Sequence, residues 1–248
     1  MTRKISVLFL ILPFLFCAAA SAQTVDEIIA KHLAARGGVD KIKAVQSMKA
    51  SGKMMMQGME APFTIRMKRP NEMRMEIDVQ GKTIVRGYDG KEAWMIMPFM
   101  GSPDPQRLSG EETKEVEDDA DIDGPLVDYQ AKGNKVELLG KEDMEGTEVY
   151  KLKVTLKSGS ERIISIDGES FLELKSTSKV TRNGQEFEVD TTVSNYKPVN
   201  GLMFPFAVES KANGQTMQQM TVDSYEVDIP MEESIFKMPA AAAQPANQ

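Results

Sequence analysis

From Met48 onward, the sequence alternates apolar and polar side chains with a period of two. The segment Met73–Gln80 shows this most clearly, because every second residue is Met, Ile or Val and the residues between are charged or amide. Strands with one dry and one wet face in antiparallel sheets have this pattern. We expect strands over Met48–Met56, Phe63–Lys68, Met73–Gln80, Thr83–Tyr88, Glu92–Met97, Lys135–Leu139, Val149–Leu156, Glu161–Ile166, Phe171–Val180, Glu186–Tyr196, Leu202–Glu209 and Thr216–Val227.

Short turn signals join these segments in meander order, among them Asp167-Gly168, Asn183-Gly184 and Asn213-Gly214. A run of about eleven or twelve strands with few helices predicts one large curled sheet. Such a sheet is an incomplete, or half, antiparallel β-barrel. Its apolar inner face needs a cover.

Three segments outside the strands can supply that cover. Thr24 and Glu27 form a capping box at the start of a helix, which Gly37-Gly38 ends. Val39, Ile42 and Val45 recur every three residues and predict a second short helix. The strongly acidic run from Ser109 to Gly124 lacks alternation and predicts a solvated helix followed by a loop, within a lid segment Leu108–Tyr129. Three helical pieces are too few to fill a barrel, so we expect a hydrophobic cavity beneath a small helical lid.

Residues 1–22 have the order of a secretory signal peptide. Basic residues precede an apolar run, and Ala20-Ser21-Ala22 provides a cleavage site before Gln23. The run is too short to span a bilayer, and we expect no transmembrane segment elsewhere. Lipid anchoring at Cys17 is the alternative, although the preceding Phe16 does not fit a lipoprotein signal. The sequence therefore predicts export to the periplasm.

Cys17 is the only cysteine, so the 226 residues after the signal peptide contain neither a disulfide nor a thiolate site. We expect one half-barrel domain over residues 23–239 and a disordered Ala/Pro/Gln-rich tail over 240–248. Loss of Arg3 and Lys4 leaves 28 basic against 37 acidic side chains, a formal charge of −9. This charge opposes binding to nucleic acid and to anionic membrane surfaces. A monomer is the expected state.

Methionine is enriched in the first half of the sheet, where eleven of the eighteen lie between Met48 and Met100. Flexible thioether side chains suit a surface that adapts to varied apolar ligands, although ordinary core filling is the alternative interpretation. Because alternation requires one dry face, we expect the inward residues to border one contiguous cavity. The residues predicted to line it are Met54, Met56, Phe63, Ile65, Met67, Met73, Met75, Ile77, Trp94, Ile96, Phe204 and Phe206.

We expect no catalytic centre, no metal site and no cofactor. The segment Asp119–Gly124 matches the first half of a calcium-binding EF-hand loop, but the twelfth position is Gln130 where a bidentate Glu is needed. His32 is the only histidine and is predicted to lie on the surface, so no histidine triad can form. A hydrolase that uses two carboxylates is a remote alternative.

Two parts of the sequence resemble a known family. Met67-Lys-Arg-Pro-Asn71, followed by Asp89-Gly-Lys-Glu-Ala-Trp-Met-Ile-Met-Pro-Phe99, is similar to the K-R-P and D-G-K-x-x-W-x-x-x-P segments of LolA-like periplasmic lipoprotein carriers. Asn200-Gly-Leu-Met-Phe-Pro205 and Phe236-Lys-Met-Pro239 resemble the closing strands of exported lipoprotein-sorting proteins of the same family. The chain departs from the carriers in its length, its acidic insert and its methionine content.

The resemblance implies a half-barrel of about eleven strands whose cavity takes up acyl chains. It also implies that Arg69, which occupies the arginine position of K-R-P, is a latch that holds the lid shut; an ordinary surface arginine is the alternative. The leading hypothesis is a carrier that takes the acyl chains of a lipoprotein or lipid from an inner-membrane donor and delivers them to an outer-membrane acceptor. A lipid-sensing or lipid-binding module without transport is the second hypothesis.

Overall fold

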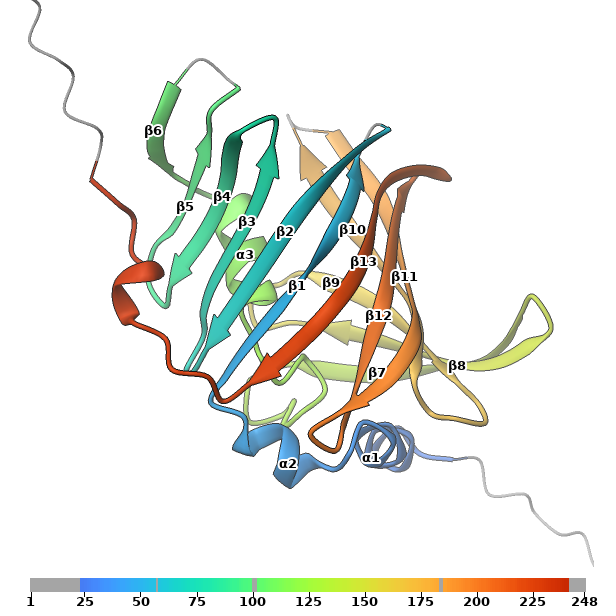
Figure 1. Cartoon of the computed structure of the whole chain (residues 1–248). Helices are drawn as coiled ribbons and strands as arrows, with labels where there is room; N and C mark the ends of the chain where they lie inside the picture. Colours follow the sequence, from blue (N-terminus) through green and yellow to red (C-terminus); the bar gives the residue numbers. More distant parts are fainter. Residues whose placement is uncertain (1–22, 57, 100–101, 183–184, 241–248) are drawn as a thin grey trace, which may run out of the picture.

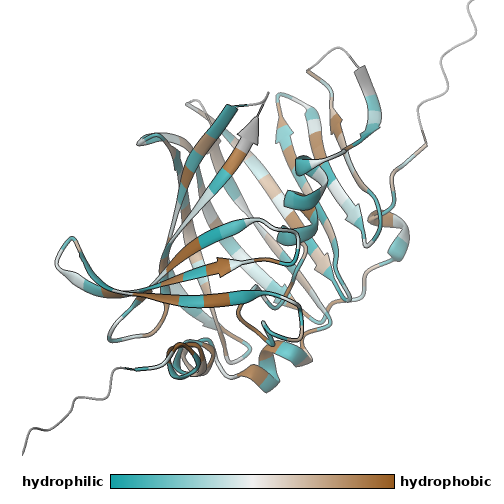
Figure 2. Ribbon diagram, turned by 180° about the vertical axis from the view of Figure 1, so that it is seen from behind, coloured by the Kyte–Doolittle hydropathy of each residue, from teal (hydrophilic) through white to brown (hydrophobic). Residues whose placement is uncertain are grey.

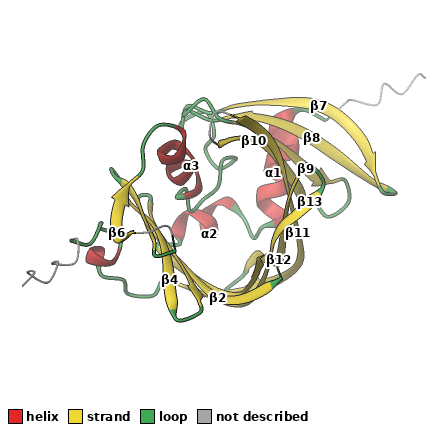
Figure 3. Cartoon of the chain, turned by 90° about the horizontal axis from the view of Figure 1, so that it is seen from above, coloured by secondary structure: helices red, strands yellow, loops and turns green. Residues whose placement is uncertain are grey.

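A computed structural model describes residues 23–56, 58–99, 102–182 and 185–240 of the chain. The predicted signal peptide and all but the first residue of the predicted tail lie outside these ranges. The described residues form a single curled sheet with helices at one end and along its opening (Figures 1 and 3).

Thirteen antiparallel strands make up the sheet in the described part of the chain. Their order across it is β6-β5-β4-β3-β2-β1-β13-β12-β11-β10-β9-β8-β7, so two meanders meet where β1 pairs with β13. The sheet does not close, and the fold is an incomplete β-barrel, as the sequence predicts. The strands are β1 Ser47–Met56, β2 Met59–Lys68, β3 Glu72–Val79, β4 Lys82–Asp89, β5 Ala93–Met97, β6 Ser102–Arg107, β7 Lys135–Met144, β8 Thr147–Thr155, β9 Glu161–Asp167, β10 Glu173–Arg182, β11 Gln185–Val199, β12 Leu202–Ala212 and β13 Gln215–Val227.

β6 is the strand that the sequence analysis did not predict. It contains Pro103 and Pro105, which lack the N–H that a strand interior needs. A strand with two prolines is tolerated here because β6 is an edge, paired on one side by β5 among the described residues. The opposite edge is β7, which carries a bulge at Leu139.

Within the described ranges the α-helices are α1 (Val25–Ala35), α2 (Val39–Ala44) and α3 (Glu111–Asp119), and a 3-10 turn η1 (Glu233–Ile235) lies near the C-terminus. The predicted capping box of α1 is present: Glu27 N donates to Thr24 Oγ1 at 3.3 Å, and Thr24 N donates to Glu27 Oε2 at 3.0 Å. α1 and α2 lie beneath one end of the barrel, and α3 lies along its opening (Figures 1 and 3). A membrane-spanning helix, with the length and apolarity that requires, is not found among the described residues.

Apolar and polar residues alternate along the strands, which Figure 2 shows as brown and teal along the ribbon, and one face of the sheet points inward. The largest buried cluster packs α1, α2 and the loop residues Leu126 and Val127 against the inner faces of β8 and β9. A second cluster lies on the inner face of β1, β2 and β3. A third packs α3 against β2–β5. The helices are therefore held by the apolar inner face of the sheet.

Two expectations about the helical segments need correction. His32 is buried, with 3% of its surface exposed, and its Nδ1 lies 2.9 Å from the carbonyl oxygen of Phe171. Burial, with the nearby positive charge of Arg36, lowers the pKa of His32 to about 4. The acidic helix α3 is not solvated all round, since Val116 and the following Ala120 are fully buried. The sequence analysis missed this narrow apolar stripe because acidic residues surround Val116 and Ala120 in the sequence.

Candidate functional site

The concave face of the sheet brings together ten of the twelve residues predicted to line a cavity. Cross-strand pairs place them in rows, such as Met67 opposite Met73 and Ile65 opposite Met75. Paired residues of an antiparallel ladder point to the same face, so these rows form one wall. The ten residues are Met54, Met56, Phe63, Ile65, Met67, Met73, Met75, Ile77, Phe204 and Phe206.

One end of this wall is closed by the helices, and several residues along the rest of it are half-buried. Met67 and Met73 are buried with Val116 of α3. Met56 and Met75 are half-buried, as is Met220 of β13, which the sequence analysis did not single out. We call Met56, Ile65, Met75, Phe204 and Met220 the methionine wall. Extending the period-two pattern through β13 would have found Met220.

Trp94 and Ile96 were expected on this wall, and the structure corrects that orientation. Ala93 packs in the cluster beneath α3, so its neighbour Trp94 points to the convex face. There Trp94 is fully buried, and its Nε1 donates to the carbonyl oxygen of Phe236 at 2.8 Å. Ile96 follows Trp94 by two residues and shares its face. The C-terminal segment that covers Trp94 is remote in sequence, so alternation alone could not distinguish the two dry faces.

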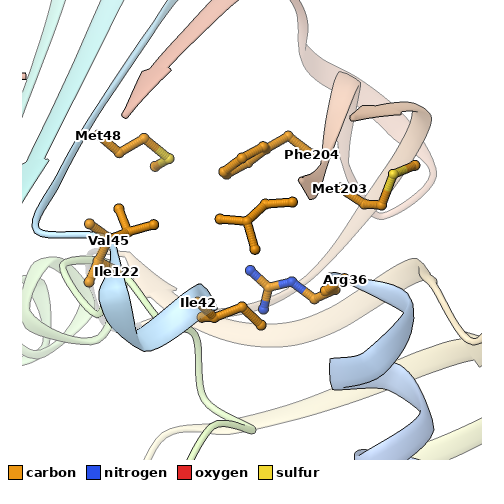
Figure 4. A pocket seen from close by; sticks show the side chains of 8 residues that line it. Arg36, Ile42, Val45, Met48, Ile122, Met203 and Phe204 are labelled. Atoms are coloured by element: carbon orange, nitrogen blue, oxygen red, sulfur yellow. The ribbon is translucent and has the colours of Figure 1, made fainter. Parts of the chain in front are cut away.

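At the closed end, a small pocket lies between the wall and the lid helices (Figure 4). Arg36, Ile42 and Val45 line it from the helices, with Ile122 from the acidic loop. The sheet contributes Met48, Leu202, Met203 and Phe204. Its volume of about 20 Å³ is room for about one water molecule. At this end, the cavity expected beneath the lid is therefore reduced to a pocket too small for an acyl chain, which would fit only if the lid separated from the wall.

Arg69 joins the sheet to the lid at this end. It lies in the β2–β3 turn, and its Nε donates to the carbonyl oxygen of Val45 at 2.6 Å. Nη2 donates to the carbonyl oxygen of Ile42 at 3.2 Å, and both terminal nitrogens bind the Asp123 carboxylate, Nη1 at 2.9 Å. The Asp123 carboxylate raises the pKa of Arg69 above its ordinary value. A bidentate pair of this kind fixes geometry as well as charge.

Asp123 is the partner that the sequence analysis did not identify. Its residue surface is 7% exposed, and its backbone carbonyl oxygen accepts from Arg36 Nη1 at 3.2 Å. Asp123 therefore ties the acidic loop to α1 as well as to Arg69. In the sequence it is one of several acidic residues in a row, and no local signal separates it from the others.

The EF-like segment is engaged by cations from the protein itself. Lys132 Nζ lies 2.8 and 2.6 Å from the two carboxylate oxygens of Asp121 and donates to the carbonyl oxygen of Gly124 at 2.9 Å. Asp119 pairs with Arg162 of β9 at 3.0 Å. With the Arg69–Asp123 pair included, the carboxylates of Asp119, Asp121 and Asp123 are each paired with a basic side chain of the protein.

The acidic helix also bridges the opening of the barrel. Glu115 lies 3.5 Å from Arg86 of β4 on one side, while Asp119 reaches β9 on the other. Asp118 accepts from the hydroxyl of Ser158, next to β9, at 2.9 Å. α3 is therefore attached to strands of both meanders.

Comparison with known proteins gives different results for the sequence and for the fold. No family model and no curated protein matches the sequence. The solved structures that match in fold include three that this chain covers almost completely. They are a DUF1329 family protein from Desulfovibrio piger (14% identity, TM-score 0.58, 86% of this chain and 97% of that one), a LolA superfamily protein from Nitrosomonas europaea (15%, 0.56, 87% and 98%) and an outer membrane lipoprotein-sorting protein domain from Vibrio parahaemolyticus (14%, 0.57, 85% and 94%). The chain thus has the fold of LolA superfamily and lipoprotein-sorting proteins, as the resemblance of its short motifs implies.

Proposed function

We propose that this protein is a periplasmic carrier that binds the acyl chains of a lipoprotein or lipid against the methionine wall. The observation that carries the proposal is an apolar concave wall, partly open to solvent, whose closed end lies beneath a lid that hydrogen bonds hold. The fold shared with lipoprotein-sorting proteins supports it. Such a wall suits a binding protein and not an enzyme.

Burial of acyl chains supplies the affinity. Each methylene removed from water contributes about 0.8 kcal/mol, so a single chain against this wall binds without any polar contact. Release then requires a competing interaction or a receiving partner. We propose that the ion pair between Arg69 and Asp123, here called the clamp, is that competitor. The lid must separate from the wall before acyl chains can reach the closed end. Closing the lid again then favours the departure of the acyl chains. Donor and acceptor proteins of the two membranes complete this cycle.

Two neighbouring methionines of β1 provide the test. Met56 is half-buried on the concave face, whereas Met55 points to the convex face and is 39% exposed. Met56→Glu should weaken binding of a fluorescent fatty-acyl probe at least tenfold, since the acyl chain of the probe would cover the charged carboxylate of the new glutamate. Met55→Glu is the matched control and should bind as the wild type does. Equal binding by both variants would exclude the concave wall as the site.

Transport needs a separate measurement. Native mass spectrometry of protein purified from its own periplasm identifies the ligand. Transfer of that ligand from inner-membrane vesicles to outer-membrane vesicles distinguishes a carrier from a binding module that keeps its lipid.

A further inference from the structure

A row of polar side chains crosses the concave face beside the methionine wall. Gln218 of β13 pairs with Ser210 of β12, Ser210 pairs with Thr191 of β11, and Thr191 pairs with Ser176 of β10. Because these pairs follow one line of the ladder, the four side chains point to the same face. We call Gln218, Ser210, Thr191 and Ser176 the polar row.

Register also fixes the surroundings of the polar row. Met56 of β1 pairs with Gln218, so the row begins directly beside the methionine wall. Ser176 pairs with Ile164 of β9 at the other end, where the core beneath α1 begins. One line across the inner face is thus apolar, then polar over four strands, then apolar again. A wall that bound apolar groups alone would not require four polar side chains in this line.

Burial confirms that the polar row points inward. Ser210 is 8% exposed, and Gln218, Thr191 and Ser176 are half-buried. By contrast Thr192, the next residue of β11, is exposed on the convex face. Hydroxyl groups on an inner face cost free energy unless they are hydrogen-bonded. Thr191 Oγ1 and Ser210 Oγ lie 3.2 Å apart, a contact that leaves each hydroxyl with further capacity to donate or accept.

The charges around the row indicate which ligand it suits. Ser178 lies two residues beyond Ser176 on the same face and pairs with Arg162, but that guanidinium already binds Asp119 at 3.0 Å. Ser176 itself hydrogen bonds the carboxyl group of Glu173. Burial raises the pKa of Glu173 and so disfavours its charged form, and an anionic headgroup would have to displace Asp119 from Arg162. Hydroxyl and amide groups instead match an uncharged ligand group that both donates and accepts.

We propose that the polar row binds the uncharged, hydroxyl-bearing headgroup of an acyl lipid whose chains lie on the methionine wall. This inference rests on the proposed function and names the class of its ligand. The junction of Met56 with Gln218 is where the chain and the headgroup of such a lipid would meet. Each hydrogen bond gained on binding contributes modestly, so two or three together favour such a lipid about tenfold over one with the same chain and no hydroxyl.

The test compares three probes of equal chain length, a monoacylglycerol, the fatty-acid methyl ester and the fatty acid, as competitors of a fluorescent fatty-acyl probe. The wild type should bind the monoacylglycerol about tenfold more tightly than the methyl ester. Thr191→Val combined with Ser210→Ala should reduce this preference to about twofold or less and leave methyl ester affinity unchanged. The control is Thr192→Val combined with Ser194→Ala, since both residues are exposed on the convex face of β11, and it should retain the preference.

Gln218→Leu, at the end of the row nearest the methionine wall, provides a second variant if the double variant folds poorly, and it should lower the preference about threefold. Equal wild-type affinity for monoacylglycerol and methyl ester would overturn the headgroup inference while the proposed function stands. Preference for the fatty acid would overturn it in favour of an anionic headgroup. Failure of every probe to bind would overturn the proposed function itself.

Discussion

The indole ring of Trp94 lies against the backbone of Gly87 on the neighbouring strand, so closely that a Cβ on Gly87 would be 2.4 Å from ring atoms Cε2 and Cζ2. The ring has no freedom to withdraw, because its Nε1 binds the carbonyl oxygen of Phe236 and the guanidinium of Arg74 lies 5.4 Å from its centre. Gly87→Ala should therefore destabilise the protein by about 2 kcal/mol, an overpacking cost. Urea denaturation measures this change. Trp94→Phe should reduce the cost of Gly87→Ala, and an unchanged cost in that background would refute the contact as its cause.

Arg69→Leu should bind a fluorescent fatty-acyl probe about tenfold more tightly than the wild type. In the proposed cycle, the hydrogen bonds that this substitution removes form only while the lid is closed, so the open, ligand-binding state would become more accessible. The melting temperature should fall by only a few degrees, because the substitution removes contacts between the lid and the sheet but none within the sheet. Arg107→Leu is the control, since its side chain is 67% exposed on β6. Equal affinity in all three proteins would make Arg69 a structural arginine without a role in release.

Asp123→Asn tests the same clamp from the lid side. The amide keeps the shape of the carboxylate but loses the charge that both terminal nitrogens of Arg69 bind, so affinity for the probe should rise about threefold. In the double variant with Arg69→Leu, the two effects should not add, because both remove one interaction. Strict additivity would show that the two side chains act independently.

Stability should depend on pH through His32. Its pKa of about 4 in the folded protein lies below the unfolded value near 6.5, so the unfolded state binds the proton first as pH falls. The free energy of unfolding should therefore decrease between pH 6.5 and pH 4 by about 3 kcal/mol from this residue. His32→Asn, which can still donate to the carbonyl oxygen of Phe171, should lose this component. Urea denaturation of both proteins across this range gives the difference, and parallel curves would contradict the assignment.

Calcium should not bind specifically to the segment Asp119–Gly124. Lys132 occupies the Asp121 carboxylate, Arg69 occupies that of Asp123, and the twelfth position lacks a carboxylate. Calorimetric titration with millimolar Ca²⁺ should show no saturable heat. A micromolar site, lost in Asp121→Asn, would contradict this prediction.

The sheet was predictable because its period-two pattern is local. Each of the twelve predicted strand segments overlaps an observed strand, and the capping box of α1 was found from two residues alone. β6 was missed because its two prolines contradict strand propensity, and only its position at an edge makes them acceptable.

The faces of the sheet were harder to predict. Alternation shows that Trp94 lies on a dry face, but the convex face is dry at this point only because Phe236, 142 residues later, covers it. His32 was misplaced for the same reason, since the carbonyl oxygen of Phe171 that satisfies it comes from a distant loop. The partner of Arg69 likewise depends on where an acidic loop happens to fold.

Within the described residues, the outer edges of β6 and β7 pair with no further strand, which has a consequence beyond this molecule. An open sheet offers a row of free N–H and C=O groups at each end, and a second chain can add its own strand there. Pro103 and Pro105 each delete one donor from the β6 edge, and the extra residue Leu139 bends β7 out of regular spacing. An open barrel with edges of this kind is therefore a poor template for strand-by-strand polymerisation, even at high protein concentration.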